Sequence, residues 1–596
     1  MPETKPPPPD PMEAWISITR NLGRAQAAIA DYVERSRNGN GFTIPDSGVV
    51  GDTFAEAWLH LLANPKQLAE AQLDFLRRQN ELWQMAGRRL AGEPVTPVAE
   101  PPKGDKRFAD EEWTREAAFD VIKQAYLTTA DWVQTTMRNV DGLDPHTHQK
   151  LDFFTRLAVD AWAPSNFLLT NPKALRATIE SGGRNLLDGL EHFVTDLERG
   201  HGALSISMTD YDAFELGRNV ATTPGKVVFQ NDLMQLIQYA PATETVFRRP
   251  LLIVPPWINK FYILDLRAKN SFIKWCVDQG LTVFVISWVN PDQSLSHKTF
   301  DDYMLEGPLA ALEAIRQATG EASVNIVGYC IGGTLTACTL AYMAARRMRG
   351  VASATYLVAL TDFAEAGEVK VFIDEHQLDL LDEHMAQRGY LEGRHMAGVF
   401  NLMRDNDLIW SFAINNYLLG KEPLPFDLLY WNADSTRMPV MMHSFYLRRM
   451  YLENKLVEPG GISLAGTSID LRRIRTPTYM LSAADDHIAP WKATYAATGV
   501  YSGPVKFVLA ASGHIAGVVN PPSANKYSYW TNRDLPADPD AWLAGAAQRL
   551  GSWWPDWLDW LKPHAGPQVP ARQPAAGGLP AIEDAPGSYV KLRLAE

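Results

Sequence analysis

Cysteine is scarce in this chain, and its scarcity excludes a fold built on disulfides. The 596 residues contain three cysteines, Cys276, Cys330 and Cys338. A disulfide framework for a chain of this length would need many more, so the sequence predicts a protein of a reducing compartment.

Long apolar runs and an excess of basic residues are also missing. No stretch approaches the ~18 apolar residues that a membrane helix needs, and the N-terminus lacks the apolar core of a signal peptide. The formal net charge is −13, which argues against a protein that binds nucleic acid through bulk charge. We therefore expect a soluble or peripheral protein with no membrane span and no nucleic-acid partner.

Motifs for metals and phosphates are absent too. His146 and His148 form a His-x-His pair, but no cysteine or acid stands near them at ligand spacing. No Gly-Lys-Ser/Thr loop is present. The sequence predicts neither a metal site nor a bound cofactor.

The first third of the chain has the periodicity of helices. Residues 1–205 are expected to form a mostly α-helical N-terminal domain with a disordered or polyproline start at Pro6–Pro9 and a linker at 94–102. This domain could dock on a partner or pack as a helical layer on the rest of the protein. The predicted helices are 12–37, 53–62, 65–91, 111–138 and others within 148–197.

From residue 206 to 596 the pattern changes to α/β. Short apolar strands alternate with helical segments, which predicts a mostly parallel sheet covered on both faces. Helical segments over 362–474 interrupt this order and predict an inserted cap over the active site. The expected strands are 226–229, 234–237, 251–254, 282–287, 323–327, 354–358, 478–481 and 506–510.

Two features near the C-terminus stand outside this alternation. A tryptophan-rich stretch at 552–561 could contact an apolar polymer surface, but helix packing in the core is the favoured interpretation. The segment 567–586 is rich in proline, alanine and glycine and is expected to be a flexible tail.

The central motif is a sharp strand-to-helix turn around Cys330. A buried strand ends in Gly328-Tyr329-Cys330-Ile331-Gly332-Gly333, and a helical pattern follows. This is the pattern of a nucleophile elbow with cysteine in place of serine, where glycines permit a strained turn that exposes the central side chain. A thiol at a helix N-terminus is favoured as the thiolate. The sequence predicts Cys330 as a nucleophile.

An elbow requires an acid and then a histidine, each on a loop after a later strand. Asp486 follows the strand at 478–481, and His514 follows the strand at 506–510. We expect His514 to take the thiol proton and Asp486 to fix the tautomer of His514. Asp485 is an alternative acid and His487 an alternative base, although His487 is the better candidate for a structural neighbour.

An oxyanion hole needs two backbone N–H donors. Ile331, directly after the nucleophile, is the expected first donor. The second should come from the loop after the strand at 251–254, which begins with two prolines that have no N–H. Ile258 is the predicted donor, with Trp257 or a later residue as alternatives, and Trp257 could instead form a wall of the pocket.

Several long motifs resemble one known family, the poly(3-hydroxyalkanoate) polymerases of the single-subunit class I. The resemblance covers roughly residues 100 to 590, and Trp257 stands where some members have cysteine. The motifs that carry it are Pro255-Pro256-Trp257-Ile258-Asn259-Lys260-Phe261-Tyr262-Ile263-Leu264-Asp265-Leu266, Gly328-Tyr329-Cys330-Ile331-Gly332-Gly333, Pro425-Phe426-Asp427-Leu428-Leu429-Tyr430-Trp431-Asn432, Asp486-His487-Ile488-Ala489-Pro490-Trp491 and Ser512-Gly513-His514-Ile515-Ala516-Gly517-Val518-Val519-Asn520-Pro521-Pro522.

The resemblance implies an α/β-hydrolase fold with a helical cap and an acyltransferase that joins (R)-3-hydroxyacyl groups from coenzyme A thioesters into polyester. The family's catalytic residues correspond to Cys330, Asp486 and His514. Coenzyme A is the leaving group, and 3-hydroxybutyryl-CoA is the expected substrate. The resemblance further implies a homodimer at the surface of cytoplasmic polyester granules, with phasins as partners. Its motifs suggest four substrate-binding residues, which are Trp257, Asp265, Trp431 and His487.

Two other functions remain open from the residues alone. A thioesterase or other hydrolase could use the same triad, because water and a hydroxyl group react through the same machinery. A non-catalytic granule-associated protein would not need the triad intact. The family resemblance, and not the triad, distinguishes the polymerase from both.

Overall fold

The chain folds into two compact units. The computed structural model describes residues 9–35 and 44–593. The helical unit consists of Met1–Asp210 and Gly398–Leu424, and the catalytic unit consists of Tyr211–Ala397 and Pro425–Glu596. The predicted insertion over 362–474 is therefore divided, because its middle part belongs to the helical unit. Of the predicted start at Pro6–Pro9, only Pro9 lies among the described residues.

The helices of the first unit follow the apolar periodicity of the sequence closely. The predicted helix at 111–138 is interrupted at Glu116, whose extended backbone separates α4 from α5. No strand occurs before Gly225 in the described residues. The helices are α1 (Pro11–Arg35), α2 (Ser47–Ala63), α3 (Pro65–Leu90), α4 (Glu112–Arg115), α5 (Ala117–Arg138), α6 (Pro145–Ala161), α7 (Pro172–Ser181), α8 (Arg184–Arg199) and α15 (Ser411–Ala413).

The segment 398–424 packs on α8 through a close backbone contact. A Cβ added to Gly189 of α8 would lie 2.0 Å from the carbonyl oxygen of Tyr417, so only glycine fits there. The Tyr417 hydroxyl donates to Asp196 at 2.7 Å, and the Asn185 amide donates to the Leu418 carbonyl at 2.7 Å. These polar contacts explain why this stretch of the insertion joins the helical unit.

Asp405, in the same segment, is a buried carboxyl group in an unfavourable environment. Its side chain is 2% exposed, and in the described structure its Oδ2 accepts no hydrogen bond. Burial raises the pKa of Asp405 to about 6, and the nearby charge of Asp160 adds to the rise while Arg156 and Arg107 oppose it. The folded protein therefore holds a proton on Asp405 that the unfolded chain releases at lower pH.

Asp405→Asn is expected to stabilise the protein at pH 8 but much less at pH 5. Because the pKa is higher in the folded state, the free energy of unfolding falls as pH rises from about 4 to about 6. Above this range the charged carboxyl costs at most about 3 kcal/mol. Thermal unfolding of both proteins at the two pH values measures the effect. Asp407→Asn, at an exposed neighbouring acid, is the matched control, and an equal gain at both pH values would contradict the assignment.

The catalytic unit contains the predicted alternation of strands and helices. Its strands are β1 (Gly225–Gln230), β2 (Met234–Tyr239), β3 (Thr245–Phe247), β4 (Leu251–Val254), β5 (Val283–Trp288), β6 (Val324–Tyr329), β7 (Val351–Leu357), β8 (Tyr390–Leu391), β9 (Met438–Pro439), β10 (Ser463–Leu464), β11 (Thr467–Ser468), β12 (Thr478–Ala483), β13 (Val505–Ala510), β14 (Ser528–Thr531), β15 (Ala547–Leu550), β16 (Gln568–Pro570) and β17 (Glu583–Asp584). Its main helices are α9 (Phe272–Asp278), α10 (Phe300–Met304), α11 (Ala310–Thr319), α12 (Ile331–Ala345), α13 (Glu375–Arg388), α16 (Asp427–Asn432), α17 (Val440–Tyr446), α18 (Trp491–Ala496), α19 (Pro539–Ala544) and α20 (Trp554–Ala565).

Eleven of these strands form one mixed sheet with a parallel centre, and the other six form three separate two-stranded sheets. Over the described residues the order is β15-β14-β13-β12-β7-β6-β4-β5-β2-β1-β17. The strands from β5 through β4, β6, β7 and β12 to β13 are parallel, and the outer strands pair antiparallel. Parallel strands place their carboxyl ends at one edge, which is where ligands bind in such sheets. The predicted α/β architecture is confirmed.

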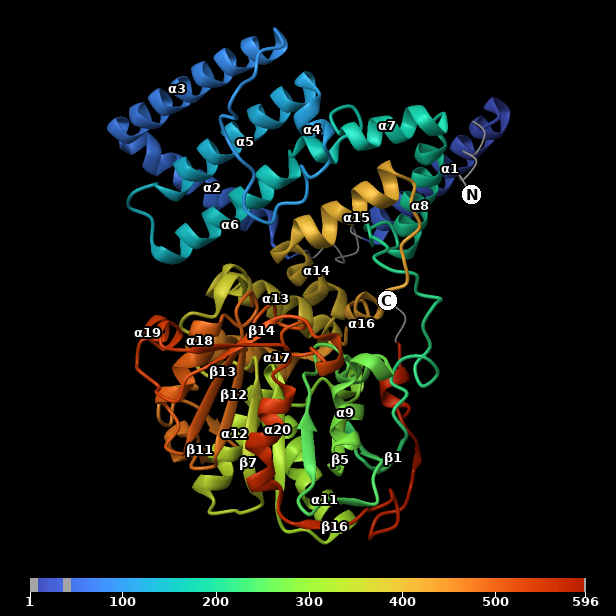
Figure 1. Ribbon diagram of the computed structural model, residues 1–596, viewed down its shortest axis with the longest axis vertical. Helices are drawn as coiled ribbons and strands as arrows, with labels where there is room; N and C mark the ends of the chain where they lie inside the picture. Colours follow the sequence, from blue (N-terminus) through green and yellow to red (C-terminus); the bar gives the residue numbers. More distant parts are fainter. Residues whose placement is uncertain (1–8, 36–43, 594–596) are drawn as a thin grey trace. The chain divides into compact units, whose positions relative to one another are not determined.

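Helices cover both faces of the sheet, as alternate residues of β7 show. Thr355 accepts a hydrogen bond from the indole of Trp557 on α20 at 2.9 Å. The next residue, Tyr356, is close enough to Cys338 on α12 that this cysteine is among the causes that raise the pKa of the Tyr356 hydroxyl. Because successive strand residues point to opposite faces, α20 and α12 lie on opposite sides of the sheet. Figure 1 shows α20, in red, crossing the strands. Trp554 and Trp557 are fully buried, which confirms the core interpretation of the tryptophan-rich stretch.

The prediction of a flexible tail over 567–586 is wrong. Strand β16 pairs with β3, and β17 pairs with β1 at the edge of the main sheet. Between them, Gly578 donates to the carbonyl of Gln317 and Arg572 forms an ion pair with Glu321 at 2.5 Å. The segment covers a sheet edge whose backbone groups would otherwise stay unpaired, a role that composition alone does not reveal.

Within the described ranges, the structure contains no helix whose length and hydropathy would let it cross a membrane.

Candidate active site

Cys330 occupies the turn between β6 and α12, as the elbow motif predicts. Its backbone has φ 53° and ψ −127°, a conformation that non-glycine residues rarely adopt. The side chain is partly exposed, in contrast to Cys276 and Cys338, which are buried. Burial raises the pKa values of the Cys276 and Cys338 thiols well above the ordinary range. Cys330 is therefore the one of the three cysteines placed for reaction.

Three glycines make the elbow possible because main-chain atoms crowd it. A Cβ at Gly332 would lie 2.2 Å from the carbonyl oxygen of Val254 and 2.7 Å from that of Pro255. A Cβ at Gly328 would lie 2.5 Å from the Cα of Gly333. The helix start thus packs directly on the end of β4, and this contact brings the two predicted oxyanion segments together.

Gly332→Ala is expected to destabilise the catalytic unit and to lower activity sharply. The added methyl group meets main-chain oxygens that cannot rotate away, and overpacking of this kind typically costs about 1–3 kcal/mol. Thermal unfolding and an enzyme activity assay measure the two effects. Gly499→Ala is the control, since nothing lies within 4 Å of its added Cβ. Unchanged stability and activity in Gly332→Ala would contradict the close contact.

His514 and Asp486 meet as the chain order of the triad predicts. Asp486 Oδ2 lies 2.7 Å from His514 Nδ1, and both side chains are buried. Asp486 Oδ1 accepts hydrogen bonds from the N–H groups of Ile488 and Ala489, both at 2.9 Å. Asp485 is exposed. The structure thus selects Asp486 over Asp485 as the partner of His514.

The ring of His514 is held between Asp486, Cys330 and Tyr329. The Tyr329 ring stacks on it with centroids 5.8 Å apart. With Nδ1 bound to Asp486, Nε2 is the nitrogen left for the hydrogen bond with the Cys330 side chain. Burial alone would lower the pKa of His514, but Asp486 and Cys330 outweigh it and raise the pKa to about 10. The site therefore favours a protonated imidazole at His514.

The predicted oxyanion donors lie on the two adjoining segments. Ile331 is the first residue of α12, so its N–H has no acceptor within the helix. Ile258 lies on the loop after β4, where its carbonyl accepts a hydrogen bond from the N–H of Thr436 at 3.0 Å. A role for Ile331 and Ile258 in an oxyanion hole stays a prediction.

The four residues predicted to bind substrate have different surroundings. The Trp257 ring is 1% exposed and packs against Trp288 and Tyr303. The indole of Trp431 donates to the Lys260 carbonyl at 2.7 Å.

The other two differ from each other in burial. The Asp265 carboxylate accepts from the hydroxyls of Thr223 and Ser271, both at 2.6 Å, which gives it a structural role in its loop. His487 is partly exposed beside Asp486. Substrate contacts for Trp257, Asp265, Trp431 and His487 stay predictions.

Two tyrosines near the nucleophile were not predicted. Tyr446 ends α17, and Tyr451 lies in the π-helical turn Leu447–Leu452 that follows. Both are buried, and for both the charge of Cys330 is among the causes that raise the pKa of the hydroxyl. The sequence shows only a helical stretch here. The register shift of a π-turn leaves no simple signal in residue spacing.

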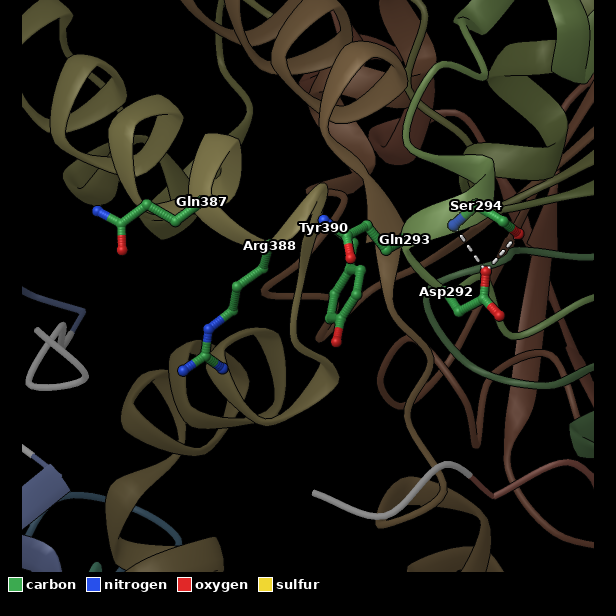
Figure 2. A pocket seen from close by; sticks show the side chains of 6 residues that line it. All are labelled: Asp292, Gln293, Ser294, Gln387, Arg388 and Tyr390. Carbon is green, nitrogen blue, oxygen red and sulfur yellow. Dashed lines mark hydrogen bonds between the residues drawn. The ribbon is translucent and has the colours of Figure 1, made fainter. Parts of the chain in front are cut away.

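A surface cavity of about 470 Å³ lies elsewhere in the catalytic unit. Figure 2 shows Asp292 accepting hydrogen bonds from Ser294. The guanidinium of Arg388, which also lines the cavity, lies apart from this pair. Its other lining residues are Gln293, Gln387 and Tyr390. No triad residue lines this cavity.

The sheet, the elbow and the chain order of nucleophile, acid and histidine define the α/β-hydrolase fold. Residues 250–521 match the sequence profile described as "alpha/beta hydrolase fold". Residues 104–276 match a second profile, described as "Poly-beta-hydroxybutyrate polymerase (PhaC) N-terminus".

Full-length relatives specify the family. The poly(3-hydroxyalkanoate) polymerase subunit PhaC of Rhizobium meliloti (strain 1021) is 47% identical over 98% of this chain and 96% of its own. The poly(3-hydroxyalkanoate) polymerase of Methylorubrum extorquens is 46% identical over 99% of both. The corresponding subunit of Cupriavidus necator is 42% identical over 95% of both. The chain belongs to the poly(3-hydroxyalkanoate) polymerase family and is an enzyme, an acyltransferase.

Proposed function

We propose that this enzyme polymerises (R)-3-hydroxyacyl groups from coenzyme A thioesters into polyester, with (R)-3-hydroxybutyryl-CoA as the substrate. The observation that carries the proposal is the 2.7 Å contact of Asp486 with His514, whose ring also meets Cys330 at the elbow. Relatives that are named as polymerases match nearly the whole chain, and this similarity supports a polymerase rather than another kind of acyl-transfer enzyme.

The first step loads an acyl group onto Cys330. The thiol proton passes to His514, and the sulfur attacks the thioester carbon of the substrate. The bond from carbon to the coenzyme A sulfur breaks, and His514 returns its proton to the departing thiolate. One thioester replaces another, so the step has little net cost. Asp486 stabilises the imidazolium throughout.

The second step forms the ester. The 3-hydroxyl group of another acyl unit attacks the Cys330 thioester. Two bases are possible for the hydroxyl proton, His514 and Asp486. The new C–O bond forms, the C–S bond breaks, and Cys330 leaves as a thiolate. The N–H groups of Ile331 and Ile258 would hold the oxygen anion of each tetrahedral intermediate.

Water must be kept from the Cys330 thioester if chain growth is to exceed hydrolysis. The parts of the insertion that belong to the catalytic unit, 362–397 and 425–474, are the segments we assign to this role. The reaction needs no metal and no resident cofactor, because coenzyme A enters with the substrate and leaves as product.

We place the enzyme in the cytoplasm, at the surface of polyester granules, as a homodimer with phasins as neighbours. These expectations derive from the family resemblance. Size-exclusion chromatography with light scattering tests the homodimer, and fractionation of granules tests the location.

The central test gives the purified protein (R)-3-hydroxybutyryl-CoA and follows coenzyme A release and polymer mass together. The proposal expects both to rise in proportion. Release of coenzyme A with free 3-hydroxybutyrate and no polymer would instead identify a thioesterase, which the same triad can support.

A further inference from the structure

Lys260 is a buried lysine at the end of the loop that follows β4, and the triad does not account for it. The residue is 4% exposed. Its Nζ lies 2.8 Å from Oδ1 of Asp434 and donates to the backbone carbonyl of Leu592 at 3.2 Å. Because a buried ion pair gains little stability over apolar residues of the same size, stability alone does not explain why this pair is here.

Asp434 lies in the segment from Trp431 to Thr436, which we call the clamp segment. This segment also binds the loop through main-chain atoms. Thr436 donates from its N–H to the carbonyl of Ile258 at 3.0 Å, and from its hydroxyl to the carbonyl of the preceding residue. The indole of Trp431 donates to the carbonyl of Lys260 at 2.7 Å. The ion pair therefore adds a charged contact between two segments that already meet along their length.

Further donors fix the carboxylate of Asp434. The hydroxyl of Tyr262 donates to Oδ2 at 2.9 Å, and Nε of Arg593 lies 3.6 Å from Oδ1. Tyr262 is fully buried and Asp434 is 6% exposed. Since both carboxylate oxygens have partners, Asp434 holds the ammonium group of Lys260 at one position.

The loop that ends at Lys260 is the one on which we expect the second oxyanion donor. Its start is fixed at the elbow, where a Cβ at Gly332 would lie 2.2 Å from the carbonyl oxygen of Val254. Ile258 lies between this start and Lys260. Over the residues that the structure describes, the N–H of Ile258 donates to no backbone carbonyl. Its value as an oxyanion donor depends on a distance of about 3 Å to the developing anion, so a small movement of the loop would lower the rate.

We propose that Lys260 is a positioning residue, whose ion pair with Asp434 holds the loop after β4 so that the N–H of Ile258 reaches the oxygen anion of each tetrahedral intermediate. Lys260 makes no contact with substrate in this role, and no bond forms or breaks at its nitrogen. The inference rests on the proposed function, in which Ile258 is an oxyanion donor. It requires a charge at a fixed place and not only a filled volume.

The test compares two reactions of Cys330 in Lys260→Met, which keeps the length of the side chain and removes its charge. Coenzyme A release from (R)-3-hydroxybutyryl-CoA passes through an oxyanion. Its kcat should fall about 10- to 100-fold with little change in KM, since a displaced donor costs less than a missing one. Alkylation by iodoacetamide displaces iodide without forming an oxyanion, so its rate should stay the same. Lys269→Met, at an exposed lysine in the same region, is the matched control.

A double variant separates positioning from stability. Lys260→Met alone leaves the carboxylate of Asp434 buried without its lysine, which should lower the unfolding temperature. Lys260→Met combined with Asp434→Asn removes both charges, so the unfolding temperature should recover while kcat stays low. Recovery of kcat together with stability would overturn the proposal, because the loss would then be a consequence of unfolding. Alkylation slowed in proportion to kcat would overturn it as well.

The double variant also serves if Lys260→Met fails to fold, and a wild-type kcat in it would count against the role of Lys260. Cys330→Ala distinguishes this inference from the proposed function. An active Cys330→Ala protein would refute the proposed function. An inactive Cys330→Ala protein, together with a Lys260→Met protein of wild-type kcat, would refute only the positioning role.

Discussion

Cys330→Ala is expected to abolish both coenzyme A release and polymer formation, with a loss of at least about a thousandfold. No other thiol can replace it, because Cys276 and Cys338 are buried and their pKa values are raised well above the ordinary range. Only the elbow holds a partly exposed sulfur beside the imidazole of His514.

Cys338→Ala is the matched control, since it removes a thiol from the same helix region without touching the elbow. It should keep most of the activity. In the native wild-type protein, iodoacetamide should modify one cysteine, and mass spectrometry should locate the label at Cys330. Residual polymerisation by Cys330→Ala, or rapid labelling of a buried cysteine, would contradict this assignment.

Asp486→Asn is expected to slow ester formation by about a thousandfold or more, and acylation by less. The carboxylate holds the proton on Nδ1 of His514 at 2.7 Å and supports the charged ring. Acylation removes a proton from a thiol, whereas elongation must remove a proton from an alcohol hydroxyl group, which is far less acidic. The second step therefore depends more on the acid.

Single-turnover experiments separate the two steps. A burst of coenzyme A measures acylation, and the rate at which a hydroxyl-bearing acceptor takes up the acyl group measures ester formation. Asp485→Asn is the control, because Asp485 is exposed and does not contact His514. An equal loss in both steps for Asp486→Asn would refute the unequal dependence.

The sequence specified the local features of this protein. The Gly328 to Gly333 motif predicted the turn at Cys330, because only glycines tolerate the close approach of helix and strand that such a turn requires. Alternating apolar strands predicted the parallel centre of the sheet. Helical periodicity predicted most of the N-terminal helices, although α2 begins at Ser47 and not at residue 53, and Glu116 divides the predicted helix 111–138. These features depend on residues that are close together in the chain, so they can be predicted from the spacing of residues.

Other features depended on contacts between distant residues. Asp485 and Asp486 are equivalent in sequence, and only the packing of the two loops brings Asp486 to His514. The composition of the proline-rich tail predicted flexibility, but the tail pairs with β1 at the edge of the sheet, which the composition does not reveal. In the same way, the backbone contact of Gly189 with Tyr417 assigns the middle of the insertion to the helical unit.

The sequence by itself thus predicted the chemistry that we propose, namely a cysteine nucleophile with an acid and a histidine in the required order. The tertiary structure alone decided which acid contacts the histidine. The physical reason is that a hydrogen bond requires a fixed distance and direction, and for residues far apart in the chain these are set by packing. The contact of Asp486 with His514 shows this most directly, because the two residues lie on loops after different strands and the packing of β12 beside β13 brings them together.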